Sequence, residues 1–434
     1  MSKKIEKHQK KIIYLIITCV FFVSIAYSFS FKIKPIVDAA TYDNIAVNIA
    51  KGDGYPNEAI GRPGPGYEYF LAGIYLLFGH SYKAVWIIQS LLLSMTALFG
   101  FYITKIILGN EFHPAIGIGA VILIGLSPDF ITIASLLMTE TLTIFLLTGS
   151  ILSALLYVKK NNNNYLALAM VGMGITSLVR GNMIIAILPV VGFLIYKKQW
   201  KRLIMSLIIL GIVLTPWTVH NYRAFGKILP FNASPGLLYS GNHPGATGEL
   251  ITTFPLPQEI HEGMNQIEFD TALGKAGKRY ILENPVEFLK LSMLRISIYF
   301  SAARPLAFWP HLTSFAKSVT IATSSLYAFI IFIGGLTGMV LSLRNPKNKE
   351  KKVMLIALAA MLPLAIAPLV IETRYRMPIY PILSTFTAFA IYYFITRKEE
   401  LRKLIKPTII VAGLIFANTA FDVIRNFDRI LDRL

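Results

Sequence analysis

Acidic residues and an arginine are concentrated in one stretch of an otherwise apolar chain, residues 37–70. A carboxylate at the edge of a membrane can accept a proton from an attacking hydroxyl group. Charged groups gathered at one membrane face therefore indicate a site for a charged, lipid-linked substrate. Asp38 lies a few residues beyond the first long apolar run, and the alternative for it is an ordinary solvated loop aspartate. The stretch contains Asp38, Asp43, Asp53, Glu58 and Glu68 beside Lys51 and Arg62.

Arginines in two other motifs could bind phosphate, because a guanidinium group presents a planar fork to phosphate oxygens. Arg62 belongs to RPGPGY, and the alternative for it is an arginine that extends to the membrane interface. In ETRYRMPIYP, Arg374 and Arg376 flank a tyrosine next to Glu372. Arginines on the outer side oppose the usual placement of basic residues, which favours a functional role for this pair.

Glu140, in LLMTETLTIF, falls within the apolar run 131–157. A carboxylate at that depth is costly, so it is either functional or the structural partner of a buried arginine. Arg180, in SLVRGN, is the obvious partner. The histidines lack the close spacing of a zinc site, and the single cysteine, Cys19, excludes a disulfide framework.

The composition indicates a polytopic membrane protein. The chain has 434 residues, of which 55% are hydrophobic and 15% charged, whereas soluble domains carry roughly 25% charged residues. The net charge of +19 does not indicate nucleic-acid binding, because the basic residues form short clusters between apolar runs. Residues 12–31 are interpreted as an uncleaved signal anchor.

A helix needs about 20 apolar residues to cross a bilayer. We expect about eleven spans (11–13), near residues 12–31, 84–107, 113–128, 131–157, 164–179, 183–197, 203–219, 317–342, 352–371, 377–396 and 406–422. Residues 286–310 are either a twelfth span or a re-entrant or interfacial helix. Eleven spans place the basic clusters on the side of the N-terminal KKIEKHQKK, which satisfies the positive-inside rule and makes that side cytoplasmic.

The predicted organisation has three parts. Residues 1–219 form an N-terminal transmembrane module with the outer loop 32–83, and residues 220–316 form an outer loop with an interfacial or re-entrant helix. Residues 317–434 contain the C-terminal transmembrane helices.

The chain resembles the GT-C superfamily of polyprenyl-phosphate-sugar-dependent membrane glycosyltransferases in its motifs and in their order along the sequence. The nearest branches are protein O-mannosyltransferases and lipid A aminoarabinose transferases. The resemblance rests on Asp38 and Tyr42, on PGYEYFLAGIYLLFG, TETL, PWTVHNYRAFG, SGNHPGATG and ETRYRMPIYP. It implies an all-α GT-C-like bundle in which Asp38 is the general base of an inverting sugar transfer. The substrate-binding residues that it implies are Tyr42, Arg62, Tyr67, Glu140, Arg180, Asn242, Glu372, Arg374 and Arg376.

The chain departs from the family pattern in the first outer loop. It has an extra glycine, Gly64, and Glu68 replaces the last proline of Arg-Pro-Pro-Gly-Tyr-Pro. Gly61 stands where relatives carry an acid, so the second catalytic carboxylate is either Glu58 or Glu68.

The resemblance predicts a plasma-membrane enzyme with an extracytoplasmic site. It would use a polyprenyl-phosphate-sugar donor and a glycan, lipid or protein acceptor. No cofactor or metal ion is expected, because one aspartate without an acidic pair at short spacing makes a poor divalent site. The alternative is a transporter or flippase of lipid-linked sugars, and a silent membrane scaffold is a third possibility. A transporter predicts polar residues at the midplane and a repeat that relates its halves. Here the polar residues are concentrated on one side, with Glu140 the main exception.

Overall fold

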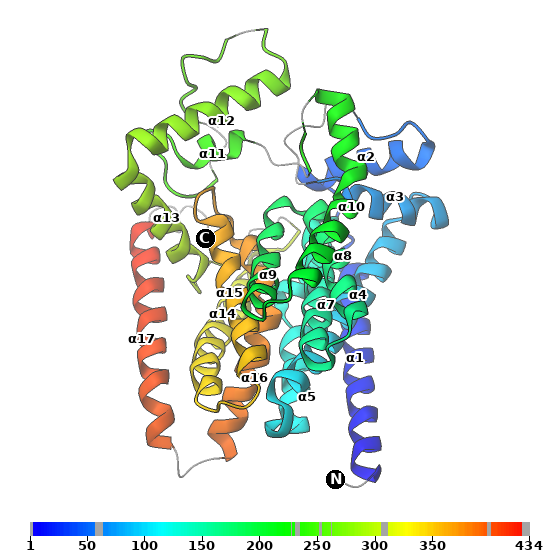
Figure 1. The fold of residues 1–434 in the computed structure, drawn as a ribbon, viewed down its shortest axis with the longest axis vertical. Coiled ribbons are helices and arrows are strands. Elements are labelled where there is room, and N and C mark those ends of the chain that lie inside the picture. Colours follow the sequence, from blue (N-terminus) through cyan, green and yellow to red (C-terminus); the bar gives the residue numbers. More distant parts are fainter. Residues whose placement is uncertain are drawn as a thin grey trace.

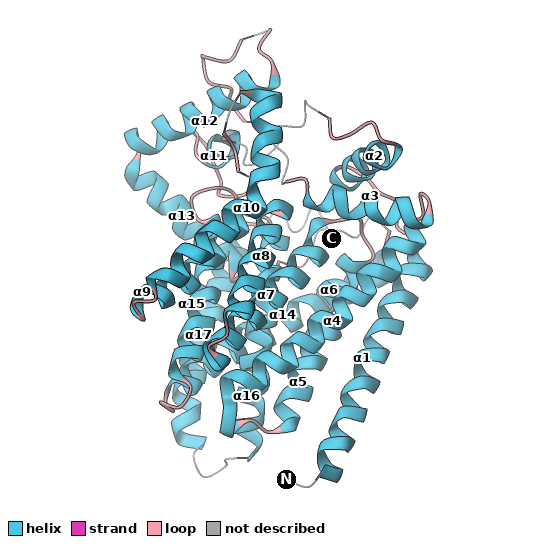
Figure 2. Ribbon diagram, turned by 45° about the vertical axis from the view of Figure 1, so that its right-hand side comes forward, coloured by secondary structure: helices cyan, strands magenta, loops and turns pink. Residues whose placement is uncertain are grey.

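The computed structural model describes residues 3–56, 64–226, 228–230, 235–250, 254–261, 263–304, 311–396 and 401–427. The predicted all-α architecture is confirmed: the regular elements of these residues are helices joined by loops, with one isolated bridge between Glu249 and Ile371 (Figure 2). The α-helices are α1 (Lys3–Phe31), α2 (Asp38–Lys51), α3 (Gly66–Phe78), α4 (Tyr82–Leu108), α5 (Pro114–Gly125), α6 (Pro128–Ala134), α7 (Thr139–Lys160), α8 (Asn163–Val179), α9 (Leu188–Tyr196), α10 (Trp200–Phe225), α11 (Gly236–Gly241), α12 (Gln266–Glu283), α13 (Pro285–Tyr299), α14 (Ser314–Leu343), α15 (Lys349–Ile366), α16 (Tyr380–Thr396) and α17 (Leu401–Arg425). Three 3-10 helices accompany them: η1 (Gly109–Glu111), η2 (Gly181–Ile187) and η3 (Thr373–Ile379).

The long helices run side by side, and α2, α3, α11 and α12 lie at the end of the bundle opposite the N-terminus (Figure 1). Seven of the described helices are long and apolar enough to cross a membrane, or eight if the bent pair α5 and α6 counts as one span. The count of about eleven is not confirmed. The predicted and observed numbers of spans differ partly because two predicted spans correspond to short helices. These are α8, with 17 residues, and α9, with 9.

The predicted spans 113–128 and 131–157 are divided differently in the structure. Ser127 caps α6, Pro128 occupies its first turn, and α6 bends by 49° from α5. The next helix, α7, begins only at Thr139. The prediction that Glu140 lies well inside the span 131–157 is therefore wrong, because α7 begins at Thr139 and Glu140 belongs to its first turn.

The ambiguous stretch 286–310 contains α13, whose 15 residues are fewer than the roughly 20 that a span needs. In Figure 1, α13 lies beside the upper end of α17 and next to α12. The described part of this stretch is consistent with an interfacial or re-entrant helix.

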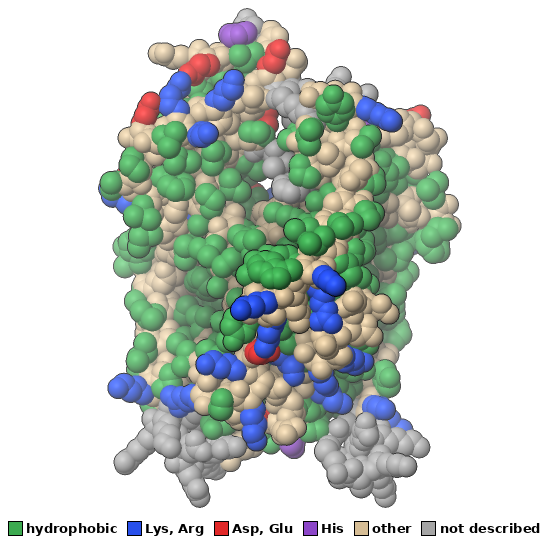
Figure 3. Space-filling model, viewed as in Figure 1, with side chains coloured by type: hydrophobic (Ala, Val, Ile, Leu, Met, Phe, Trp, Pro, Cys, Tyr) green, Lys and Arg blue, Asp and Glu red, His purple; other side chains and the backbone are tan. Residues whose placement is uncertain are grey.

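Charged side chains are distributed unevenly between the two ends. On the face shown in Figure 3, many Lys and Arg side chains gather over the lower third, where the N-terminus lies. The Asp and Glu side chains on this face lie mainly at the upper end. The positive-inside rule predicts this asymmetry if the lower end faces the cytoplasm.

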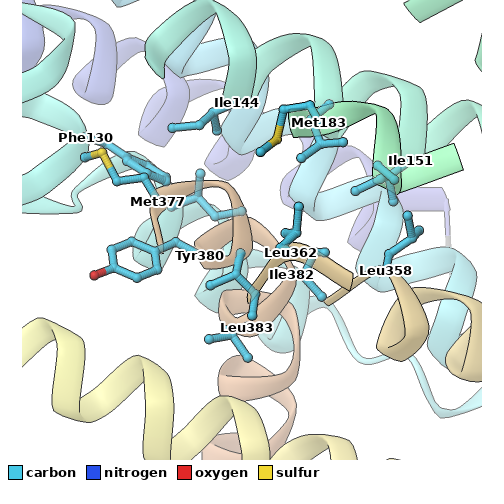
Figure 4. Packing of buried hydrophobic residues seen from close by; sticks show 14 of the residues in the cluster. Phe130, Ile144, Ile151, Met183, Leu358, Leu362, Met377, Tyr380, Ile382 and Leu383 are labelled. Carbon is cyan, nitrogen blue, oxygen red and sulfur yellow. The ribbon is translucent and has the colours of Figure 1, made fainter. Parts of the chain in front are cut away.

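The interior is held together by close helix packing. Phe130, Met377, Tyr380 and Leu383 belong to a continuous hydrophobic cluster that reaches into the middle of the bundle (Figure 4). Glycines on α14 bring it close to α16: a Cβ atom at Gly338 would lie 2.1 Å from the Phe386 carbonyl oxygen.

We predict that Gly338→Ala destabilises the protein by about 1–3 kcal/mol, because the added methyl group must push two packed helices apart. Gly413 in α17 is the matched control, since a Cβ there meets no atom within 4 Å. Gly413→Ala should leave the thermal unfolding midpoint in detergent unchanged or slightly raised. Equal midpoints for the two variants would contradict the packing argument.

Candidate active site

Asp38 is the first residue of α2 and lies at the open edge of a cluster of charged side chains. Its Oδ2 accepts a hydrogen bond from Nη2 of Arg374 at 3.0 Å. The Asp38 side chain is 45% exposed and that of Arg374 only 10%, so the cluster is accessible from the Asp38 side. Val37, immediately before it, has φ 50°, a conformation that β-branched residues rarely adopt. Such strained backbone is concentrated at functional sites.

Arg374 connects three carboxylates. Its Nε atom lies 2.7 Å from Oε2 of Glu372 and 3.5 Å from Oε1 of Glu140. The same Glu140 oxygen accepts a hydrogen bond from Nη1 of Arg180 at 2.7 Å. Glu140 is 1% exposed, so both guanidinium groups contact a carboxylate that is shielded from solvent. The predicted partnership of Glu140 and Arg180 is present.

Both arginines come from positions where a helix is interrupted. Arg180 has extended backbone between α8 and η2, and Arg374 belongs to η3, which leads into α16. The Tyr375 ring lies near both side chains, with its centroid 4.8 Å from Cζ of Arg180 and 5.8 Å from Cζ of Arg374. The aromatic ring interacts favourably with each cation.

The first outer loop is placed beside Arg180 by glycines. Gly64 has φ 147°, and a Cβ atom there would lie 2.1 Å from the Leu178 carbonyl oxygen. Gly66 also packs closely on Val179, the last residue of α8, since a Cβ atom there would lie 2.7 Å from Val179 Cγ2. The extra glycine of this chain therefore allows the loop backbone to contact the end of α8, immediately before Arg180.

Tyr42 and Tyr67 form one wall of the cluster. Tyr42 follows Asp38 by one helical turn, and its ring meets that of Tyr67 edge to face at a centroid distance of 5.5 Å. Burial, together with the charges of Asp38 and Glu140, raises the pKa of Tyr42, so its phenol is neutral at physiological pH. It can donate a hydrogen bond but cannot act as a second anionic base.

Gln89 supports this wall and was missed by the sequence analysis. Its Oε1 accepts a hydrogen bond from the Tyr67 hydroxyl at 2.9 Å, and its Nε2 donates to the carbonyl oxygens of Ala134 and Leu136. Gln89 is fully buried in α4. A glutamine inside the apolar run 84–107 is the signal that could have revealed it.

Glu68 belongs to a separate, aromatic cluster. It is fully buried in the first turn of α3, and its Oε1 accepts a hydrogen bond from the Tyr55 hydroxyl at 3.4 Å. Tyr55 packs against Trp217, which stacks on His220 with a centroid distance of 4.4 Å. The PWTVH motif of α10 therefore holds the first outer loop. Glu58 and Arg62, which were also predicted as site residues, lie outside the described residues.

Asp43 shows what a structural aspartate in this loop looks like. Its two oxygens accept hydrogen bonds from the hydroxyl groups of Tyr75 and Tyr82, each at 2.6 Å, and one oxygen lies 2.9 Å from His80 Nε2. The carboxylate ties α2 to α3 and α4. Asp38 is more exposed and pairs with Arg374, so its carboxylate is accessible to an acceptor hydroxyl group.

The side chains of Arg376 and Asn242, which were also predicted as site residues, bind backbone carbonyl oxygens rather than the carboxylates of this cluster. Arg376 is buried and donates hydrogen bonds to the carbonyl oxygens of Ser301 and Arg304. Asn242 donates to the Pro368 carbonyl oxygen at 2.9 Å. Of the two arginines in ETRYR, Arg374 alone is paired with Asp38.

No group of three or more His, Cys, Asp or Glu side chains in the described part of the chain could hold a metal ion. The absence of a metal or cofactor requirement remains a prediction.

The sequence model of a family described as dolichyl-phosphate-mannose-protein mannosyltransferase matches residues 62–220. Among solved structures, ArnT from Cupriavidus metallidurans bound to undecaprenyl phosphate is similar, with a TM-score of 0.52 and 13% identity over 92% of this chain and 63% of that chain. The Archaeoglobus fulgidus oligosaccharyltransferase AglB, in complex with an inhibitory peptide and a dolichol-phosphate, has a TM-score of 0.49 and 13% identity over 93% of this chain and 56% of that chain. No curated protein matches in sequence.

The chain therefore has the fold of the GT-C superfamily of membrane glycosyltransferases, and the resemblance expected from its motifs is confirmed. It spans less than two thirds of the length of the two solved structures. The matched family segment includes Tyr67, Glu140 and Arg180. Asp38 and Arg374 lie on either side of that segment, and the fold brings them together.

We predict that Glu140→Gln destabilises the protein by about 3–5 kcal/mol, because two buried guanidinium groups lose a shared counter-charge. Glu259 is the control, since its pair with Arg279 is solvent-exposed. Glu259→Gln should have no measurable effect on denaturant unfolding in detergent. If Glu140→Gln unfolds like the wild type, Glu140 does not hold the arginines in place.

Proposed function

We propose that the protein is an inverting membrane glycosyltransferase that moves a sugar from a polyprenyl-phosphate donor to a hydroxyl group of a glycan, lipid or protein acceptor. The observation that carries the proposal is the 3.0 Å pair of Asp38 and Arg374 at the open edge of a buried cluster of charges. The family match over residues 62–220 and the GT-C fold support this class of reaction.

In the proposed reaction, Asp38 accepts the proton of the acceptor hydroxyl as its oxygen attacks the anomeric carbon of the donor sugar. The bond between that carbon and the phosphate oxygen breaks, and its electron pair leaves on the lipid phosphate. Attack from the face opposite the phosphate inverts the anomeric configuration. Arg374, with Arg180 behind it, stabilises the charge that develops on the phosphate.

The charge balance of the cluster suggests how donor binding prepares the base. Three carboxylates (Asp38, Glu140 and Glu372) surround the guanidinium groups of Arg180 and Arg374. A phosphate adds further negative charge, so it fits best where it replaces a carboxylate as the partner of Arg374. Asp38 is the most exposed of the three. Its release by the donor phosphate would leave its carboxylate available to the acceptor hydroxyl.

The distribution of charge supports an extracytoplasmic site. If the basic N-terminal end faces the cytoplasm, Asp38 and α2 lie at the outer end of the bundle (Figure 1). Glu140, the main exception to the one-sided distribution of polar residues expected from the sequence, belongs to the first turn of α7 and joins the same cluster. The polar site therefore lies at one end, which favours the transferase over the flippase. The plasma membrane is the location that we propose for this site, as the resemblance predicts.

We predict that Asp38→Asn lowers sugar transfer from a radiolabelled polyprenyl-phosphate sugar by roughly 10²- to 10⁴-fold, because the amide cannot accept the proton. Asp53, an exposed aspartate in the same outer loop, is the control, and Asp53→Asn should transfer normally. Undiminished transfer by Asp38→Asn would remove the assigned base. Movement of the labelled lipid across vesicles without transfer would identify a flippase instead.

We also predict that EDTA leaves the transfer rate unchanged, because arginines rather than a metal ion neutralise the leaving phosphate. The measurement compares purified protein before and after chelation. Loss of turnover that is restored by added Mg²⁺ or Mn²⁺ would contradict this assignment.

A further inference from the structure

The five residues before Glu372, 367–371, are held by the second outer loop, which contains Asn242 and Gly248, and by α13. Nδ2 of Asn242 donates a hydrogen bond to the Pro368 carbonyl oxygen at 2.9 Å, and Nη1 of Arg295 donates to that of Ala367 at 2.8 Å. The backbone N–H of Ile371 donates to the Gly248 carbonyl oxygen at 3.3 Å. These contacts fix both ends of the segment 367–371, which leads directly to Glu372 and Arg374.

Arg295 is buried, with 1% of its surface exposed, and its described hydrogen-bond partners are neutral oxygens. Two of these are the carbonyl oxygens of Ala367, next to the last residue of α15, and of Gly241, the last residue of α11. Carbonyl groups at helix C-termini carry partial negative charge, which stabilises a cation there. Burial lowers the pKa of Arg295 to about 10, so the side chain remains charged at neutral pH.

Asn242 links Arg295 to this segment. Its Oδ1 accepts a hydrogen bond from Arg295 Nη2 at 3.2 Å, and its Nδ2 also donates to the Leu238 carbonyl oxygen. The neighbouring Gly241 contacts the segment through its backbone, because a Cβ atom there would lie 1.8 Å from the Leu369 carbonyl oxygen. The side chain of Asn242 is fully buried, and all these contacts are with protein atoms.

We infer that Asn242 and Arg295 are positioning residues that hold the segment 367–371 so that Arg374 meets Asp38. The inference rests on the proposed function. Arg374 lies in the short 3-10 helix η3, three residues after Ile371, so its place depends on where this segment is held. A displacement of about 1 Å at a catalytic group can cost 10²-fold in rate. The role differs from the direct substrate contact that the sequence predicted for Asn242.

The test uses Asn242→Asp, which keeps the shape and the acceptor for Arg295 but removes the donor to Pro368. Asn418→Asp is the matched control. Asn418 donates to the Ser297 carbonyl oxygen on α13 at 2.9 Å and accepts from its hydroxyl group, so it holds α13 against α17. Both variants therefore lose an asparagine amide that donates to backbone carbonyl oxygens, those of Leu238 and Pro368 for Asn242 and that of Ser297 for Asn418.

Two measurements are made on the full-length protein in nanodiscs. Amide hydrogen exchange over residues 367–376 should rise about tenfold or more in Asn242→Asp and stay unchanged in Asn418→Asp. The KM for a polyprenyl-phosphate sugar should rise roughly tenfold in Asn242→Asp alone. A lower fraction of folded enzyme reduces the maximal rate but not KM, so a purely structural role would not produce this change.

A second pair of variants, at Arg295, distinguishes the hydrogen bonds that its side chain donates from the space that it fills. Arg295→Lys keeps a donor for the carbonyl oxygens and should retain a lower KM than Arg295→Met, which fills the space without donating. Unchanged exchange over 367–376 in Asn242→Asp, or faster exchange with an unchanged KM, would overturn the inference. A wild-type protein that neither transfers nor cleaves the donor would refute the proposed function, and the exchange measurement would still decide whether Asn242 holds the segment.

Discussion

The arrangement of this protein's outer end depends on one buried carboxylate, Glu140, which lies between the guanidinium groups of Arg180 and Arg374. An unpaired charge is very costly in a low-dielectric interior, so these three side chains stabilise one another or none of them can be buried. They come from α7, from the junction of α8 and η2, and from η3. Because Arg374 also reaches Asp38, the same interaction fixes α2 relative to the C-terminal part of the chain.

The site is built where regular helices end. Arg180 and Arg374 both occupy interruptions of the helical backbone, and Asp38 follows a residue with positive φ. Irregular backbone at a membrane boundary is tolerated when protein groups satisfy its polar atoms. Asn242 and Arg295 do so for the segment before Arg374, since they donate to carbonyl oxygens that follow α15. Stability and positioning of the proposed phosphate-binding arginine therefore depend on the same contacts.

Several elements of the site could be predicted from the sequence. Glu140 and Arg180 stand out because charged residues in apolar runs must have partners, and the structure pairs them. Asp38 stands out because it is a carboxylate only a few residues beyond the first apolar run. Gln89 was missed, although a buried amide in an apolar helix must also find partners. The break between α6 and α7, just before Glu140, was missed as well, because residues 135–138 are mostly apolar and a hydropathy window cannot show that the helix is interrupted there.

By itself the sequence determined that the chain is embedded in a membrane as helices, that its polar groups gather towards one side, and that Glu140 needs a cation. Tertiary structure alone decided which of two chemically identical side chains belongs to the site: Arg374 rather than Arg376, and Asp38 rather than Asp43. Residues 374 and 376 are two positions apart in a 3-10 helix with about three residues per turn, so they point in different directions. Asp38 and Asp43 lie about 140° apart around α2, because an α-helix turns roughly 100° per residue. Only the helices packed on each side determine that Arg374 and Asp38 meet while Arg376 and Asp43 bind the scaffold.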